Sequence, residues 1–530
     1  MKAIKYIFAS AILTVGCLSF SSCSDLEENP KTFLNPSNYY NNEDEVQSAL
    51  VGVYNRLRNM YTANSQLYIA NLELYTEQGW PTYNKNSMEK LKFWYDINNA
   101  SIGNSDRGVN RIWSAAYEAI NRANIVLARH QEVTMSETSH NRIEGQAKFI
   151  RAYAYWHLIR LFGRVPVITT HTIGLDGLEV PRNTLDESYE IVINDLTDAI
   201  KLLPKRGEDS SYDIWRATKG AAQALLGEVY LYRATIDGSN NTQYLQLAKQ
   251  LCSDVMTSGA GYDLMENFTD QYYWFNANAK NNKESLFELQ FAPLKGQSND
   301  MHIRFGLGRT YSYMGCYMYA RMGVSGFLYK EMKDNGDKRA DALLTHFKLN
   351  DGTSCDYNAE NFRWVPEITN DRSQPHRCVF NCKYFDNRTA ASLNTPNANF
   401  PMLRYAEVLL NYAEAANLLK AGDGLTELNR IRTRAGLEPY TFTTQAAMDE
   451  EIFQQRRFEF VGEGKIFYDE LRRGVLGQYA SNDYKRAHAL GISYFNEAED
   501  VAFKAGRNFL FKIPQSDLDS NPALEQNPDN

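Results

Sequence analysis

The chain has 530 residues and a formal net charge of −8 at neutral pH. An acidic balance argues against nucleic acid as a partner, because phosphate backbones are bound by clustered lysine and arginine. The composition includes 34 Tyr, 26 Phe and 7 Trp, and beyond the first residues no apolar run reaches the ~18 residues that a membrane helix needs.

The first 22 residues have the layout of a secretory signal peptide. Two lysines begin the chain, a largely apolar run covers residues 7–18, and two serines stand directly before Cys23. A charged start, a short apolar run and small residues before the cut site are the three parts of such a signal, and this run is too short to span a bilayer. We therefore expect residues 1–22 to be removed and residues 23–530 to form one mature domain.

Cys23 is the expected site of lipid attachment. A small-residue pair directly before a cysteine resembles a bacterial lipoprotein signal, in which that cysteine becomes the acylated first residue. Cys17 is a competing candidate, but cleavage there would leave Leu18 and Phe20 in the mature tail; cleavage without lipid is the other alternative. The acidic residues after Cys23 resemble the export signal of surface-exposed lipoproteins in some Gram-negative bacteria, which implies the outer leaflet of the outer membrane.

The remaining cysteines do not form a pattern typical of a metal site. They are Cys252, Cys316, Cys355, Cys378 and Cys382. The spacing of Cys378 and Cys382 occurs at some zinc sites, but only His376 lies near them in sequence, and an odd number does not suit a disulfide framework. Buried free thiols are expected, or one disulfide between Cys378 and either Cys382 or Cys355; we predict no metal and no cofactor.

Helical periodicity covers much of the chain. Trp113, Tyr117, Ile120 and Leu127 are spaced by three, four or seven residues, as one face of a helix requires. The same argument predicts helices near residues 43–58, 144–162, 185–203, 222–232, 244–256, 403–413, 425–435 and 448–461. Together they define a helical scaffold over about 40–60, 113–256 and 400–475.

The scaffold is interrupted by two long segments with little periodicity. Residues of about 62–110 and 260–398 are rich in Asn, Gly and aromatic residues, and loops of such length in a compact protein usually serve a function. The predicted fold class is mainly α, with antiparallel helix pairs of the tetratricopeptide kind but no regular 34-residue repeat, and with little β structure.

Several motifs occur in the order that one known family shows. They are the acidic tail after Cys23, Trp113-Ser-Ala-Ala-Tyr117-Glu-Ala-Ile-Asn121, Ala217-Thr-Lys-Gly-Ala-Ala222, Pro401-Met-Leu-Arg404-Tyr405-Ala-Glu407, Arg456-Arg457 with Glu459, and Phe511-Lys-Ile-Pro514-Gln515. Together they span essentially the whole chain. In these motifs the sequence resembles the SusD/RagB family.

This resemblance implies binding and not catalysis. Members are cell-surface lipoproteins that capture glycans or other nutrients and pair with a SusC-like TonB-dependent transporter, over which they act as a lid. The resemblance also implies tetratricopeptide-like helix pairs that face the transporter and variable loops that hold an oligosaccharide. The alternative is a transporter lid with little glycan affinity, whose cargo is peptide or another nutrient. Signatures of hydrolase elbows, phosphate loops and zinc proteases are absent from the sequence, and we predict no enzyme.

Six charged residues of the matched motifs stand in or beside apolar helices. They are Arg404, Glu407, Arg456, Arg457, Glu459 and Glu463. Such groups are rarely buried unless they are paired. We expect them to form a partly buried ion-pair network that joins helices, and not a sugar site.

The first group of candidate ligand contacts lies in the segment of 62–110. Trp80, Tyr83 and Asn84 follow a Gly-punctuated turn, and an exposed aromatic face can stack on a pyranose while amides bind its hydroxyls. Trp94 is a further candidate, although Phe93-Trp94-Tyr95 is equally compatible with a buried strand.

The second group lies in the segment of 260–398. Tyr273 and Trp274 belong to four consecutive aromatic residues, which cannot all point inward in a regular structure, so at least one should be exposed. Tyr311 and Tyr313 lie on one face if their segment is extended. For both groups, packing in the core is the competing interpretation.

The assignment of the lipid site predicts a simple contrast between two cysteines. Cys23→Ser should abolish incorporation of labelled palmitate and move the full-length protein from the membrane fraction to the soluble fraction. The control, Cys17→Ser, should leave both readouts unchanged. The reverse result would place the anchor at Cys17.

Overall fold

The computed structural model of the chain describes residues 39–61, 72–81, 107–171, 179–294, 296–299, 322–348, 351–366, 378–386, 396–491 and 509–528. Helices account for most of these residues, and three small antiparallel sheets supply the strands. Among the described residues, no helix is long and apolar enough to cross a membrane. Cys23 and Cys316 lie outside this part of the chain.

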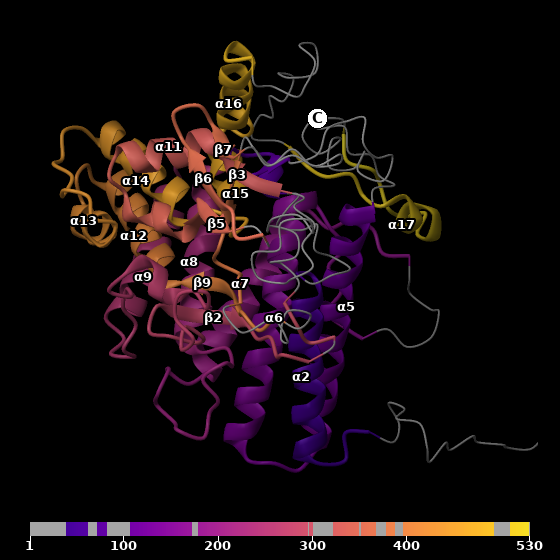
Figure 1. Ribbon diagram of the computed structural model, residues 1–530. Helices are drawn as coiled ribbons and strands as arrows, with labels where there is room; N and C mark the ends of the chain where they lie inside the picture. Colours follow the sequence, from indigo (N-terminus) through magenta and orange to yellow (C-terminus); the bar gives the residue numbers. More distant parts are fainter. Residues whose placement is uncertain are drawn as a thin grey trace, which may run out of the picture.

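The first half of the fold is a series of helices in which each packs on the next (Figure 1). They are α2 (Glu43–Asn59), α5 (Arg107–Arg129), α6 (Glu137–Phe162), α7 (Leu185–Leu202), α8 (Lys219–Thr235) and α9 (Thr242–Met256). Helices α2, α6, α7, α8 and α9 begin at side-chain caps. In α7 the cap is a capping box, in which Thr184 and Glu187 bind each other's backbone. Helices therefore occupy most of the stretches of 40–60 and 113–256 in which the sequence predicts a scaffold.

The second helical group continues the same scaffold. Helix α12 (Tyr405–Leu419) packs on α9, and α13 (Leu425–Arg434) and α14 (Gln445–Glu459) pack on α12. Small residues allow close approach: Gly424 lies so near the backbone of Ala413 that a methyl group there would be 2.6 Å from its Cα. The prediction placed the end of the scaffold near 475, but α15 (Ile466–Arg473) is followed by α16 (Gln478–Ala489) and α17 (Gln515–Ser520).

Short strands lie within the segments that were predicted as long loops, and they leave β structure a small part of the fold, as predicted. Strand β2 (Ser285–Leu289) pairs with β9 (Phe400–Arg404). A second sheet has the order β1-β3-β8-β4, and a third has β5-β6-β7. Their bounds are β1 (Trp80–Pro81), β3 (Met322–Ser325), β4 (Leu343–Leu344), β5 (His346–Lys348), β6 (Ser354–Asn358), β7 (Arg363–Val365) and β8 (Cys378–Asn381).

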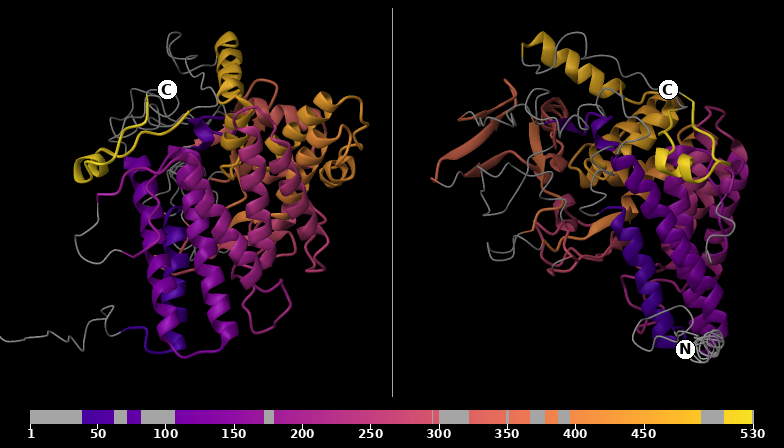
Figure 2. Two further views of the ribbon diagram at one scale, coloured as in Figure 1. Left: turned by 180° about the vertical axis from the view of Figure 1, so that it is seen from behind. Right: turned by 90° about the vertical axis from the view of Figure 1, so that its right-hand side faces the viewer.

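These strands escaped the sequence analysis because most are two to five residues long and several are buried on both faces. Strands β2, β3, β8 and β9 are buried at every residue, so they lack the alternation that marks a half-buried strand. The right-hand view of Figure 2 shows the strands of the middle segment on the side of the molecule opposite the long helices of the first half. The molecule thus has a helical side and a strand-bearing side.

Four of the cysteines are buried and free: Cys252, Cys355, Cys378 and Cys382. The interpretation as small buried thiols is confirmed for them, and a disulfide between Cys378 and either partner is wrong. The Sγ of Cys378 packs directly against the backbone of Gly323 on the neighbouring strand, where any Cβ would clash. Cys378 therefore contributes to the fold by its small size.

A buried ion-pair network joins the two sides, as predicted. Arg404, at the end of β9, donates from Nη1 to Glu284 (2.8 Å) and Glu459 (2.9 Å), and from Nη2 to Glu463 (2.8 Å). Arg434 binds Glu284 and Glu459 in turn. All of these side chains are 4% exposed or less. Burial alone would raise the pKa of Glu459. The guanidinium groups of Arg434 and Arg404 outweigh burial and hold this pKa far below its ordinary value.

The network extends into both parts of the fold. Arg339, in the strand-bearing part, binds Asp337 and Glu459, and Lys383 binds Glu463 at 2.7 Å. Within the helical part, Arg472 binds Glu414 and Asp469, Arg456 binds Asp469, and Lys465 binds Glu407. Each charge named in this network therefore has a partner of opposite charge, which offsets part of the cost of desolvation.

Removal of the central cation should be far more costly than removal of a surface cation. Arg404→Met leaves three buried carboxylates without their shared partner and should lower the free energy of unfolding by about 3–5 kcal/mol. Arg56→Met is the control, because Arg56 and Glu118 form a partly exposed ion pair and should contribute at most about 1 kcal/mol. Denaturant unfolding measures both, and equal losses would contradict the buried network.

Candidate functional site

Trp80 is not the exposed stacking platform that the sequence predicts. Its side chain is 3% exposed, and its ring centroid lies 4.9 Å from that of Tyr484 and 6.5 Å from that of Phe327. The reason is α16, which the sequence analysis did not include and which packs Tyr484 on the indole. The indole Nε1 is buried without a hydrogen-bond partner among the described residues.

The aromatic run at 272–275 divides between core and surface. Tyr272 is buried and donates to Glu463 of the ion-pair network at 3.1 Å. Tyr273 and Trp274 are half-buried, with Trp274 edge-on to Phe385. Phe275 is 38% exposed, so the expectation that at least one of the four is exposed is confirmed.

The other candidate contacts, Tyr83, Asn84, Trp94, Tyr311 and Tyr313, lie outside the described residues. Strands β1 and β3, which are described, show where the chain enters and leaves these segments. In the antiparallel pair of β1 and β3, Pro81 lies opposite Met322. Two segments that are more than 200 positions apart in the sequence are therefore attached to one strand pair. Their contact with a ligand remains a prediction.

A cleft of about 550 Å³ lies beside this strand pair, and we call it the β1 cleft. Its lining includes Glu77, Phe327, Lys330, Glu331, Asp334, Phe362, Arg457, Tyr479, Asn482, Asp483 and Arg486. The rings of Phe327 and Phe362 are 4.2 Å apart, and the guanidinium of Arg457 lies 4.2 Å from the ring of Tyr479. The cleft thus combines aromatic rings with carboxylate and amide groups, which suits a hydroxyl-rich ligand.

Buried charges hold the wall of the β1 cleft. Arg457 on α14 donates from Nε and Nη2 to the two carboxylate oxygens of Glu77, at 2.6 and 2.7 Å. Gln78 donates to the carbonyl of Arg457. Bidentate pairing of this kind fixes orientation as well as distance. The turn that precedes β1 is therefore fastened to the helical scaffold.

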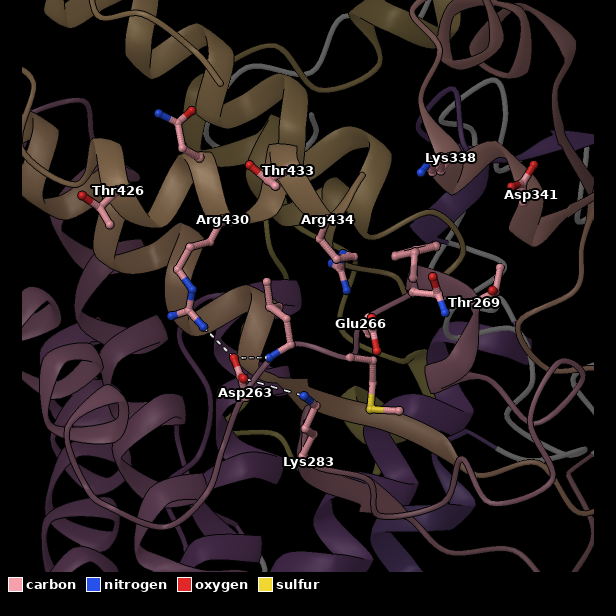
Figure 3. A pocket seen from close by; sticks show the side chains of 15 residues that line it. Asp263, Glu266, Thr269, Lys283, Lys338, Asp341, Thr426, Arg430, Thr433 and Arg434 are labelled. Atoms are coloured by element: carbon pink, nitrogen blue, oxygen red, sulfur yellow. Dashed lines mark hydrogen bonds and ion pairs between the residues drawn. The ribbon is translucent and has the colours of Figure 1, made fainter. Parts of the chain in front are cut away.

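A larger pocket, of about 960 Å³, lies between α13 and the segment that follows α9 (Figure 3). Asp263 accepts from Arg430 at 2.6 Å and lies 3.7 Å from the ammonium of Lys283. Figure 3 shows Thr426, Thr433, Lys338 and Asp341 around the same space. Its lining side chains are mostly polar, and the aromatic ring of its lining, Phe268, is 3% exposed.

The two pockets differ in what they can bind. The pocket of Figure 3 offers hydroxyls and charges but no accessible aromatic face, so it lacks the stacking platform that suits a pyranose. The sequence analysis did not predict it, because its residues come from separate segments without a recognised motif. Among the described residues, no group of three or more His, Cys, Asp and Glu is placed to hold a metal ion.

Comparison with known proteins gives one consistent result. A model of the SusD family matches residues 235–529, and a model described as starch-binding associating with outer membrane matches residues 27–231. SusD-like protein P2 of Formosa agariphila is 25% identical, with 99% of each chain covered. Starch-binding protein SusD of Bacteroides thetaiotaomicron is 22% identical, with 77% of this chain and 76% of that protein covered.

The fold also matches solved structures. A laminarin binding SusD-like protein superimposes with a TM-score of 0.73 at 23% sequence identity, with 93% of this chain and all of that chain covered. At this identity the likeness is evidence for the fold alone.

Asp483, in the β1 cleft, should make stability depend on pH. Its Oδ2 accepts from Ser325 at 2.5 Å, and burial, with the neighbouring Glu77, raises its pKa from 3.8 to about 7 against the opposing effects of Ser325, Arg486 and Arg457. Between pH 4 and 7 the folded chain keeps a proton that the unfolded chain releases, so this group lowers stability as pH rises, by up to about 1.4 kcal/mol per pH unit. Asp483→Asn should remove that slope.

The measurement is denaturant unfolding of wild type and variant at several pH values from 4 to 8. Asn482→Ala is the matched control, since it alters the same cleft without changing an ionisable group. Parallel stability curves for wild type and Asp483→Asn would show that Asp483 titrates at its ordinary pKa.

Proposed function

Because this chain belongs to the SusD family, we propose that it is a lipid-anchored protein of the cell surface that binds an oligosaccharide and delivers it to a SusC-like TonB-dependent transporter. The proposed ligand contacts are Tyr83, Asn84, Trp94, Tyr273, Trp274, Tyr311 and Tyr313. Trp80 is proposed to support this region from within the core, in keeping with its burial.

The observation that carries this proposal is the pairing of β1 with β3. Pro81 and Met322 are register partners, so the segments that hold the two groups of predicted aromatic contacts are attached to adjacent backbone positions. A binding site needs residues from separate parts of the sequence to converge on rigid elements. The ion pair of Glu77 and Arg457 supplies that rigidity on one side of the pair.

Relatives support the class of ligand. One is described as a starch-binding protein and another as laminarin binding; both polymers are glucans. Aromatic side chains can stack on the C–H faces of such sugars while amides bind their hydroxyls. Because individual contacts of this kind are weak, we expect a Kd between micromolar and millimolar, equivalent to about −8 to −4 kcal/mol.

The proposed partner and location rest on the lipoprotein signal at Cys23 and on the family of the chain, and not on its pockets. Acylation at Cys23 would hold the protein on the outer membrane, and the helical side would face the transporter. Tethering both proteins to one membrane raises their effective concentration, so a weak contact between them is sufficient. Copurification of the acylated protein with a transporter from outer membranes tests this part of the proposal.

Calorimetric titration of the mature chain without Cys23 tests the ligand. Saturable heat should appear with one class in a panel of plant, microbial and host oligosaccharides, and Trp94→Ala or Tyr83→Ala should each raise the Kd by roughly 2- to 10-fold, because each removes one aromatic contact.

Tyr244→Ala is the control, because Tyr244 lies on α9 in the helical scaffold and stacks on Tyr230. Its Kd should match that of wild type. Absence of heat across the panel would refute glycan binding by the isolated protein and would favour the alternative of a lid whose cargo is recognised by the transporter.

A further inference from the structure

A third pocket, of about 640 Å³, lies between α2, the segment that leads into α8 and the end of β2. We call it the Trp215 pocket. Its lining is Val51, Tyr54, Asn55, Arg58, Trp215, Glu288, Leu289, Gln290, Phe291, Ala292, Gly296 and Gln297. None of these residues lines the β1 cleft or the pocket of Figure 3. Its volume falls within the range of small-molecule sites.

Trp215 is held in a fixed orientation in this pocket. Its ring stands edge-on to Tyr54, with centroids 5.2 Å apart at 78°, and the guanidinium of Arg216 lies 4.5 Å from the ring centroid. Arg216 is in turn hydrogen-bonded to Gln47 and Gln146 and paired with Asp213. The indole nevertheless remains partly exposed. An immobilised, partly exposed indole loses little entropy when a ligand stacks on it.

The polar groups of the pocket are only partly used by the protein. Arg58 donates to Asn55 Oδ1 at 2.6 Å and to the carbonyl of Gly296 at 3.3 Å, and its guanidinium lies 5.6 Å from the ring of Phe291. Within the described residues, no protein hydrogen bond is made by Asn55 Nδ2, by the side-chain amide of Gln297 or by the indole Nε1 of Trp215, and the side chains of Asn55 and Gln297 are exposed. Donors and acceptors are thus available beside an aromatic ring.

The wall of the pocket carries little accessible charge. Arg58 and Glu288 are the ionisable side chains of its lining other than the phenol of Tyr54. Glu288 is 6% exposed and accepts from the amide of Asn281 and from Asn399 Nδ2, at 3.0 and 2.8 Å. Burial raises the pKa of this carboxyl. A highly charged ligand would find no matching set of charges here.

We propose that the Trp215 pocket is a second binding site, which takes a neutral oligosaccharide. This inference rests on the proposed function for the class of ligand. One pyranose ring stacks on Trp215, and its hydroxyls bind the amides of Asn55 and Gln297. A long glycan held at the strand-bearing loops then gains a second point of attachment, and two weak sites on one chain give a higher apparent affinity than either alone.

A protein contact is the competing explanation, since the rim is apolar. Val51, Ile214 and Leu294 in or beside the pocket are 45%, 56% and 56% exposed. Two exposed side-chain amides in the lining of this pocket, those of Asn55 and Gln297, favour a sugar, because an apolar protein surface would bury those amides without partners at a cost of about 1–3 kcal/mol each. The apolar rim is compatible with the C–H faces of the rings.

The test uses the mature chain labelled with 5-fluorotryptophan. The seven tryptophans should give separate ¹⁹F resonances, and Trp215→Phe assigns the one from Trp215. The probes are maltohexaose, laminarihexaose and cellohexaose as neutral sugars, any further neutral sugar that binds in calorimetry, and hexagalacturonate as a charged one. We expect a neutral sugar to shift the Trp215 resonance in a saturable manner.

A second variant leaves the labelled Trp215 in place. Asn55→Ala combined with Gln297→Ala should weaken the titration of the Trp215 resonance by roughly 5-fold or more, since each amide is expected to bind a hydroxyl. Gln243→Ala, at an exposed position on α9, should leave that titration unchanged.

The outcomes separate this inference from the proposed function. Sugar binding that shifts other tryptophan resonances but not that of Trp215 would overturn the second site and leave the proposed function in place. A shift of Trp215 with hexagalacturonate alone would overturn the assignment to neutral sugars. Absence of both heat and shifts for every sugar would overturn the proposed function and this inference with it.

Discussion

The fold depends on the buried contact between Arg404 and three carboxylates, Glu284, Glu459 and Glu463. These groups come from the residue before β2, the end of β9, the end of α14 and the turn after α14, so one guanidinium fixes a strand pair against the C-terminal helices. A buried charge that loses its partner costs about 3–5 kcal/mol, so the members of the cluster stabilise one another. The cluster is therefore well suited to specify one arrangement of strands and helices.

From this contact the two sides of the molecule are coupled. Arg339 and Lys383 extend the network into the strand-bearing side, while Arg456, Arg472 and their acidic partners continue it through the helices. The pair of Arg457 and Glu77 reaches the turn before β1. The segments proposed to bind a glycan are thus attached to a scaffold that is held together by charge pairing as well as by apolar packing.

The sequence predicted the helices well because amphipathic spacing, caps and glycine stops all act locally; the helix expected at 185–203 spans Leu185–Leu202. The ion-pair network was predictable because arginine and glutamate inside apolar helices have few alternatives to pairing. Strands β2, β3, β8 and β9 were missed because burial on both faces removes their alternation. Strands β5, β6 and β7 do alternate, but over three to five residues only. The prediction that Trp80 is exposed was wrong, because its burial depends on α16, which lies some 400 residues later in the sequence. The Trp215 pocket was missed because it is formed by three distant segments, and no local sequence pattern marks where they meet.

The joining of two distant segments at β1 and β3 has a consequence for evolution. In the part of the chain that the structure describes, Trp80 and Pro81 pair with β3, so the segment that follows β1 and the segment that precedes β3 meet the described fold at one place. A change in the length of either segment should cost the fold little free energy, because the entropy of closing a loop grows slowly with its length. A lineage can therefore lengthen or shorten these two segments more readily than it can alter the buried charge pairs of the scaffold.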